Sequence, residues 1–228
     1  MQSYQADFIE FLVRAGVLTF GDFTTKSGRK TPYFINTGNY RTGRQLGRLG
    51  GFYARALIEH WGKNFDNLYG PAYKGIPLAV TTGIALSADC GHDVSITYNR
   101  KELKDHGERG GIIGHKYSGG ERVVIIEDVI TAGTSVRETL ALLAENNNPQ
   151  VAGVIVSVDR MERGQGEKSA IEEIQAEFDF PVYSIVNVRE IINHLFNRSL
   201  DDKIYVDLDM KQRMQAYLRE YGVEAKSG

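Results

Sequence analysis

Two adjacent carboxylates, Glu127 and Asp128, stand immediately after the apolar run at residues 123–126. Small and hydroxyl-bearing residues follow at 131–135, and a helical pattern begins directly after them. Backbone N–H groups at a helix start attract phosphate, whereas carboxylates suit ribose hydroxyls or a magnesium ion beside it. Residue types in this order therefore indicate a site for a sugar phosphate.

The elements around these residues should place them at one edge of a sheet. Residues 123–126 are all β-branched, which is typical of a strand buried on both faces of a parallel sheet. Val136, Leu140 and Leu143 recur on one face of the helix that follows. The acids then lie at the carboxyl end of a central strand, where open α/β sheets bind their ligands.

The rest of the chain predicts an α/β fold with a central parallel sheet flanked by helices, because strands and helices alternate regularly from Leu68 onward. Before that point we expect helices at 4–15 and 42–60, the second capped by Thr42. The further strands are predicted at 67–69, 94–98, 151–158 and 182–186, and the further helices at 77–89, 170–178 and 207–221.

Residues 17–40 differ in character and predict an antiparallel hairpin apart from the main sheet, which we call the hood. Two short β-like runs flank the basic turn TKSGRKT, which contains Lys26. Phe34, next to Ile35, could stack on a flat heterocycle. An alternative is a hairpin whose apolar face simply packs on the core.

Residues 99–120 interrupt the alternation with the glycine-rich, basic sequence NRKELKDHGERGGIIGHKYSGG. A loop of this length without secondary structure is uncommon in a compact domain and often serves as a lid. Its glycines would act as hinges and its cations would meet an anionic ligand on closure. A solvated loop without function is the alternative.

The sequence GPAYKGIP at residues 70–77 is a candidate second anion site between a strand and a helix. Gly70 and Gly75 would permit close backbone approach, and Lys74 adds a positive charge. A plain tight turn explains the same residues. The chain contains no GxxxxGK[ST] pattern, which argues against a nucleoside triphosphatase.

Arg160, in VDRMERG, is predicted at the carboxyl end of the strand after the acid-bearing one. Its guanidinium could hold a carboxylate through two parallel hydrogen bonds. A surface salt bridge is the alternative explanation.

Composition limits the class of protein. The chain has 228 residues, a hydrophobic fraction of 42% and a net charge of −2, which suits one α/β domain and argues against nucleic acid or anionic membrane as a main partner. There is no membrane-length apolar run and no basic signal-peptide region at the N-terminus. Cys90 is the single cysteine, and the histidines lack zinc-site spacing. We expect a cytoplasmic enzyme.

The motif EDVITAGTS closely resembles the phosphoribosyl diphosphate (PRPP) binding motif of the type I phosphoribosyltransferases. TKSGRKTPYFIN, GPAYKGIP, NRKELKDHG and VDRMERG occur around it in the order typical of the orotate branch of that family. The resemblance extends from about residue 8 to about residue 217. One departure is Glu127, where many relatives carry Asp, and it keeps the charge.

The resemblance implies a type I phosphoribosyltransferase fold with an N-terminal hood, in a single domain over residues 1–228. It implies transfer of the phosphoribosyl group from PRPP to orotate in pyrimidine biosynthesis, giving orotidine 5′-monophosphate and diphosphate. It also implies a homodimer with shared active sites, a flexible lid at 99–120, and Mg²⁺ held mainly by substrate and water rather than by protein ligands.

The resemblance further assigns roles to individual residues. For PRPP binding these are Lys26, Tyr73, Lys74, Arg100, Lys101, Lys104, His106, Glu127, Asp128, Val129, Ile130, Thr131, Ala132, Gly133, Thr134 and Ser135. For orotate binding they are Phe34, Ile35, Thr131 and Arg160. Catalytic roles are expected for Lys26, Lys101, Lys104, His106 and Asp128, and no general base is identified.

Two other functions are compatible with parts of this pattern. One is a regulator of nucleotide synthesis that binds PRPP without turnover, but it would need a nucleic-acid surface that the near-neutral charge does not indicate. The other is a phosphoribosyltransferase for another base, such as a purine. Arg160 and the hood sequence argue against it.

Overall fold

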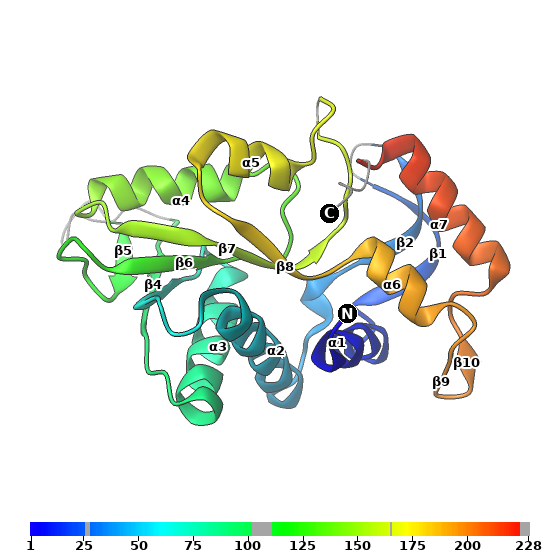
Figure 1. The fold of residues 1–228 in the computed structure, drawn as a ribbon, viewed down its shortest axis with the longest axis horizontal. Helices are drawn as coiled ribbons and strands as arrows, with labels where there is room; N and C mark the ends of the chain where they lie inside the picture. The colour runs from blue at the N-terminus through cyan, green and yellow to red at the C-terminus, as the bar shows by residue number, and fades with distance from the viewer. Residues whose placement is uncertain (26–27, 102–110, 165, 224–228) are drawn as a thin grey trace.

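A computed structural model describes residues 1–25, 28–101, 111–164 and 166–223 of the chain (Figure 1). Among these residues, six strands form the main sheet in the order β5-β4-β3-β6-β7-β8. The acid-bearing strand β6 therefore lies inside the sheet, as the sequence predicts. The strands are β3 (Asn67–Tyr69), β4 (Ser95–Asn99), β5 (Ile112–Gly114), β6 (Arg122–Ile126), β7 (Gln150–Asp159) and β8 (Val182–Asn187).

Strand β5 corrects the expectation that residues 99–120 form a loop without secondary structure. It pairs antiparallel with β4, whereas every other pairing in the main sheet is parallel. Ile112 is buried, and Gly114 lies so close to β4 that a Cβ there would be 2.2 Å from the carbonyl oxygen of Ile96. An apolar pair within a glycine-rich stretch is thus enough to form an edge strand. Residues 102–110 lie outside the described part.

Helices cover both faces of the sheet, as expected for this fold class. Figure 1 shows α2 (Gly43–Trp61) and α3 (Gly75–Cys90) on one face, and α4 (Thr134–Glu145) and α5 (Ala170–Phe178) on the other. The side chains of β6 alternate between the two layers. Val124 and Ile126 join the core cluster of α2 and α3, and Val123 and Ile125 join the cluster of α4 and α5. The prediction of a strand buried on both faces is confirmed.

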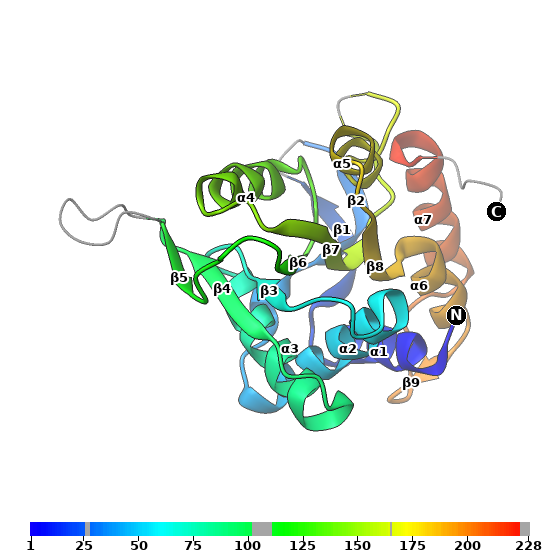
Figure 2. The same cartoon turned by 60° about the vertical axis from the view of Figure 1, so that its left-hand side comes forward.

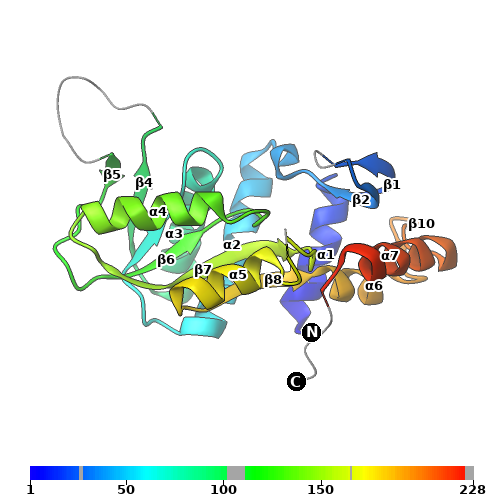
Figure 3. The ribbon, with the colours of Figure 1, turned by 90° about the horizontal axis from the view of Figure 1, so that it is seen from above.

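The hood hairpin forms a two-stranded antiparallel sheet of its own, separate from the main sheet. Figure 3 shows it at the same end of the molecule as α6 and α7, opposite β5, and in Figure 2 α6 and α7 again lie on the side opposite β5. Helix α7 packs on β2, so the last helix of the chain supports the hood. The elements are α1 (Ser3–Arg14), β1 (Leu18–Thr24), β2 (Lys30–Ile35), the 3₁₀ turn η1 (Thr37–Asn39), α6 (Val188–Leu195), β9 (Ser199–Leu200), β10 (Lys203–Ile204) and α7 (Leu208–Tyr221).

Local capping explains where two of the helices begin. Thr42 accepts a hydrogen bond from the backbone N–H of Gln45 and caps α2, as predicted. Helix α6 was missed, although Asn187 and Glu190 form the same kind of capping box at its start. Across the described residues, no helix has both the length and the hydropathy that a membrane span needs.

Candidate active site

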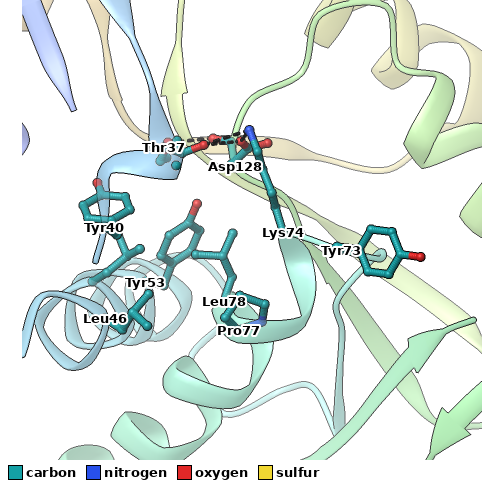
Figure 4. Close-up of a pocket in the computed structure, with 12 residues that line it drawn as sticks. Thr37, Tyr40, Leu46, Tyr53, Tyr73, Lys74, Pro77, Leu78 and Asp128 are labelled. Carbon is teal, nitrogen blue, oxygen red and sulfur yellow. Dashed lines mark hydrogen bonds and ion pairs between the residues drawn. The ribbon is translucent and has the colours of Figure 1, made fainter. Parts of the chain in front are cut away.

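The Asp128 carboxylate lies at the carboxyl end of β6 and joins two other segments of the chain. Its Oδ2 accepts hydrogen bonds from Thr37 Oγ1 at 2.6 Å and Lys74 Nζ at 2.8 Å (Figure 4). Thr37 comes from η1, near the end of the hood, and Lys74 precedes α3. Burial alone would raise the pKa of Asp128, but the bonds from Lys74 and Thr37 hold that pKa below its ordinary value. Asp128 is therefore ionised at neutral pH.

Glu127, the neighbouring acid, has the opposite electrostatic character. Burial raises its pKa to about 7, and the negative charge of Asp128 adds to the effect. Ser135 Oγ donates to Glu127 Oε2 at 2.5 Å and partly offsets the rise. Tyr53 Oη donates to the Glu127 carbonyl oxygen at 2.8 Å. The pair therefore contains one carboxylate that keeps its charge and one that titrates near neutrality.

The loop between Asp128 and α4 ends at Gly133, whose φ is +70°. A Cβ on Gly133 would lie 2.7 Å from Ile174 Cδ1, so both the backbone angle and the packing require glycine. Arg137 braces the loop by donating to the Ala132 carbonyl oxygen at 2.7 Å. Helix α4 then starts at Thr134, and its first N–H groups lack intrahelical acceptors. The predicted hydroxyl turn therefore leads into a helix start, as expected, and its phosphate-binding role stays a prediction.

The 70–75 loop lies between β3 and α3, as predicted. A Cβ on Gly70 would lie 2.2 Å from the Gly75 carbonyl oxygen, so the two glycines permit close approach of the backbone to itself. Ala72 N donates to Asn99 Oδ1 at 2.7 Å and ties the loop to β4. The Lys74 side chain is 61% exposed, and anion binding by this loop stays a prediction.

A cavity of about 280 Å³ lies beside the Asp128 cluster. Its rim is polar and its floor is apolar, formed by side chains of α2 and α3 (Figure 4). Tyr40 also lines it, and within the described residues the Tyr40 hydroxyl is buried without a hydrogen-bond partner. The lining residues include Thr37, Tyr40, Leu46, Tyr53, Lys74 and Asp128.

A second, larger cavity of about 570 Å³ is lined by four of the residues expected to bind PRPP. Arg100 and Lys101 line it from the end of β4, and Thr134 and Ser135 line it from the start of α4. Lys101 Nζ also lies 5.2 Å from the centre of the Tyr73 ring. Cations facing a helix N-terminus suit a ligand that carries several phosphate groups.

Arg160 lies at the end of β7 in a separate polar cluster. Its Nε and Nη2 donate to Glu162 Oε1 at 2.9 Å and 2.6 Å, and its guanidinium lies 5.3 Å from the centre of the Tyr33 ring. Both side chains of this salt bridge are mostly shielded, with exposed fractions of 15% and 17%. The alternative of a surface salt bridge is therefore partly correct, since a bridge exists, but it is not at the surface.

The two hood residues predicted to bind orotate are only partly buried. The Phe34 ring stacks on Phe23 at 5.5 Å, so one of its faces is already occupied. Ile35 packs against the main core cluster. Neither lines the two cavities described above. Lys26, Lys104 and His106 lie outside the described residues, so their assigned roles stay predictions.

Three residues of the site were not predicted as such. Thr37 bonds Asp128 directly, and Ser157 on β7 donates to the Asp128 carbonyl oxygen at 2.6 Å. Tyr53 lies within the helix predicted at 42–60, and its hydroxyl donates to the Glu127 carbonyl oxygen. The sequence could have indicated Thr37, because its hydroxyl directly follows the PYFIN run of the hood. The roles of Tyr53 and Ser157 depend on tertiary packing.

The similarity to known proteins extends over nearly the whole chain. The phosphoribosyl transferase domain family matches residues 36–184. Orotate phosphoribosyltransferases from Lachnoclostridium phytofermentans and Clostridium acetobutylicum are 52% and 51% identical, covering 99% and 98% of this chain and 100% of each relative. The crystal structure of the Francisella tularensis orotate phosphoribosyltransferase is 35% identical, with a TM-score of 0.82 over 95% of this chain and 99% of that chain.

Proposed function

The chain belongs to the orotate phosphoribosyltransferase family, and we propose that it transfers the phosphoribosyl group of PRPP to orotate, giving orotidine 5′-monophosphate and diphosphate. This reaction is a step of pyrimidine biosynthesis. The observation that carries the proposal is the acid pair at the end of β6. Asp128 lines one cavity together with Lys74, and Ser135, which bonds Glu127, lines the second cavity together with Arg100 and Lys101. The similarity to a 52% identical relative over 99% of the chain supports it.

The acid pair suits the chemistry of this displacement. Cleavage at the anomeric carbon develops positive charge on the ribose and negative charge on the departing diphosphate. Asp128 keeps its charge and would stabilise the ribose side, and both carboxyl groups would hold ribose hydroxyls. The backbone amides and hydroxyls of 131–135 would hold the 5′-phosphate. Catalysis is then mainly positional and electrostatic.

Lys74 must change partners during the reaction we propose. In the ligand-free chain its Nζ bonds Asp128 and Thr37, at 2.8 Å and 3.0 Å. A diphosphate offers a stronger counter-charge, and the exposed Lys74 side chain can move without unpacking the core. PRPP binding would draw Lys74 to the diphosphate, together with Tyr73, Arg100 and Lys101, and leave Asp128 free for the ribose.

The site also fits Mg²⁺ as a cofactor of this reaction. Among the described residues no group of three His, Cys, Asp or Glu side chains could hold a metal ion. The carboxylates of Glu127 and Asp128 are adjacent, and Mg²⁺ commonly binds through one or two carboxylates, water and substrate phosphates. When bound, the ion would neutralise part of the negative charge of the diphosphate. We expect it to be held mainly by substrate and water rather than by protein ligands.

We further propose a homodimer with shared active sites, working in the cytoplasm. An exposed apolar stripe on α3 supports the dimer, with Ile84 63% exposed and Val80 36% exposed one turn away. Tyr73, which lies shortly before α3 in the sequence, is also 65% exposed. Mixing inactive Lys104→Ala and Arg160→Ala homodimers tests the sharing. If Lys104 serves the partner's site, activity should recover to about a quarter of wild type after subunit exchange.

No recovery in that mixture, with exchange confirmed by mass spectrometry, would mean that Lys104 serves its own chain. In that case every site of a mixed dimer would carry one defect. The result of the mixing experiment therefore distinguishes shared active sites from independent ones, and it does not depend on where residues 99–120 lie.

The activity itself is tested by following the loss of orotate's ultraviolet absorbance on addition of PRPP and Mg²⁺. We expect turnover of orotate and little turnover of uracil, hypoxanthine or adenine. Turnover of a purine instead would contradict the base specificity. PRPP binding without turnover of any base would favour a PRPP-sensing regulator.

A further inference from the structure

One carboxylate oxygen of Glu162 collects four hydrogen bonds. Arg160 donates to Oε1 from Nε and Nη2, at 2.9 Å and 2.6 Å. The hydroxyls of Tyr217 and Tyr33 donate to the same oxygen, at 2.9 Å and 3.2 Å. Glu162 is thus bonded far more extensively than an ordinary surface partner of an arginine.

These bonds bring together three segments that are distant in sequence. Tyr33 lies on β2 of the hood, Tyr217 lies on α7, and Glu162 follows β7. Backbone contacts add to the connection, because Glu162 forms an isolated β-bridge with Gly222 and Val223 N donates to the Met161 carbonyl oxygen at 2.8 Å. Glu162 is therefore held in place by the hood and by the C-terminal segment together.

The geometry of the pair leaves one side of the Arg160 guanidinium available. Glu162 occupies the side formed by Nε and Nη2, and the Tyr33 ring lies 5.3 Å from the guanidinium carbon. Within the described residues, Nη1 has no hydrogen-bond partner. A planar guanidinium that is fixed along one side points its other donors in a defined direction.

Glu162 could influence a bound carboxylate in two opposite ways. Its negative charge reduces the attraction of Arg160 for an anion, and its hydrogen bonds fix the orientation that two parallel bonds to a carboxylate require. The orientation effect should be the larger, because a long arginine side chain loses much rotational freedom when it binds unless it is already held. The tyrosine bonds strengthen this holding.

We propose that Glu162 is a positioning residue for the base site, which fixes Arg160 so that it selects a base bearing a carboxylate. The inference rests on the proposed function, in which Arg160 receives the carboxylate of orotate. It adds that the hood and the C-terminal helix contribute to base selection through Tyr33 and Tyr217, which donate hydrogen bonds to Glu162.

Steady-state kinetics of Glu162→Gln test the proposal. The amide keeps the size and one acceptor oxygen but removes the charge that strengthens the Arg160 bonds. We expect the KM for orotate to rise about tenfold, as for a weakened bond to a charged group, while the KM for PRPP changes less than about twofold. Inhibition by uracil, which lacks the carboxylate, should be unchanged. A loss confined to the carboxylate-bearing base is not expected of a merely structural residue.

Two further variants provide matched controls. Glu167→Gln removes a 92% exposed carboxylate that pairs with Arg163 in the same loop, and it should leave both KM values unchanged. Glu162→Asp keeps the charge, but its side chain is one methylene shorter, so the carboxylate lies farther from Arg160. We expect a smaller rise in the orotate KM than in Glu162→Gln. The aspartate variant also gives the answer if the glutamine variant folds poorly.

Three results would overturn the proposal. A lower orotate KM in Glu162→Gln would mean that Glu162 competes with the substrate carboxylate. Equal increases in the KM for orotate and for PRPP would indicate general damage. A large loss in Arg160→Ala with none in Glu162→Gln would refute the inference alone, whereas an unchanged orotate KM in Arg160→Ala would also refute the role of Arg160 on which it rests.

Discussion

The ends of β6 and β7, two neighbouring parallel strands, hold their charged residues in different ways. Asp128 after β6 pairs with Lys74, which comes from another loop and has a 61% exposed side chain. Arg160 after β7 pairs with Glu162, only two residues away, and both side chains are mostly shielded. Asp128 therefore has a partner, Lys74, that can move away, whereas Arg160 has a partner, Glu162, that is held in place.

This difference matches the ligand that each strand end would receive. A ribose bearing a diphosphate supplies its own negative charge, so Lys74 can exchange Asp128 for the diphosphate and remain paired itself. The base site meets a single carboxylate and needs a guanidinium in a fixed orientation. Exposed ion pairs contribute about 0–1 kcal/mol, whereas breaking a buried pair costs about 3–5 kcal/mol. Substitutions at the two strand ends should therefore have different consequences.

The largest effect is expected from Asp128→Asn at the β6 end. The amide keeps the shape of the side chain but removes the charge opposite the developing positive charge on the ribose. We expect kcat to fall about 100- to 1000-fold, as for the loss of one preorganised electrostatic group. The measurement is the orotate absorbance assay at saturating substrates.

The melting temperature of Asp128→Asn serves as the control, because the carboxylate also accepts bonds from Thr37 and Lys74. A variant that melts near the wild-type temperature and loses activity supports an electrostatic role. Near wild-type kcat would remove Asp128 from the catalytic group, and the comparison of the two strand ends would then concern binding alone.

Glu127 sharpens the comparison, since the β6 end contains a second acid with the opposite pKa shift. Burial raises the pKa of Glu127 to about 7 from its ordinary 4.5, so the folded chain binds a proton that the unfolded chain has released between these values. The stability that this proton provides is fully present below about pH 4.5 and is lost as the pH rises through about 7.

The free energy of unfolding should therefore fall by up to about 3 kcal/mol between pH 4.5 and pH 7 on account of Glu127. In Glu127→Gln this contribution should disappear. Urea unfolding of both proteins at several pH values gives the measurement. The same slope in both proteins over this range would contradict the assignment of the raised pKa to Glu127.

The sequence predicted those parts of the fold and site that depend on local pattern. The run at 123–126 predicted a strand buried on both faces, and the hydroxyl turn predicted the helix start at Thr134. Lys74 was expected near the acids, and the structure places it 2.8 Å from Asp128.

Features that depend on contacts between distant segments were not predictable in the same way. Tyr217 of α7 bonds Glu162 across 55 residues of sequence, and no local pattern indicates that contact. Helix α6 was not predicted because it has only eight residues and begins directly after β8, with no turn sequence between them. β5 was missed because its apolar residues are few and glycines surround them, although edge strands need little more.

The smallest effect is expected from Lys74→Gln, measured as a change in stability at pH 7. Because the Lys74 side chain is 61% exposed, we expect the free energy of unfolding to fall by less than about 1 kcal/mol. Lys63→Gln is a matched control, since within the described part of the chain exposed Lys63 donates only to the neutral carbonyl of Gly91. If Lys74→Gln destabilises the fold by several kcal/mol while Lys63→Gln does not, the Lys74–Asp128 ion pair is a fixed structural contact, like the Arg160–Glu162 pair. The proposed release of Lys74 to the diphosphate would then be wrong.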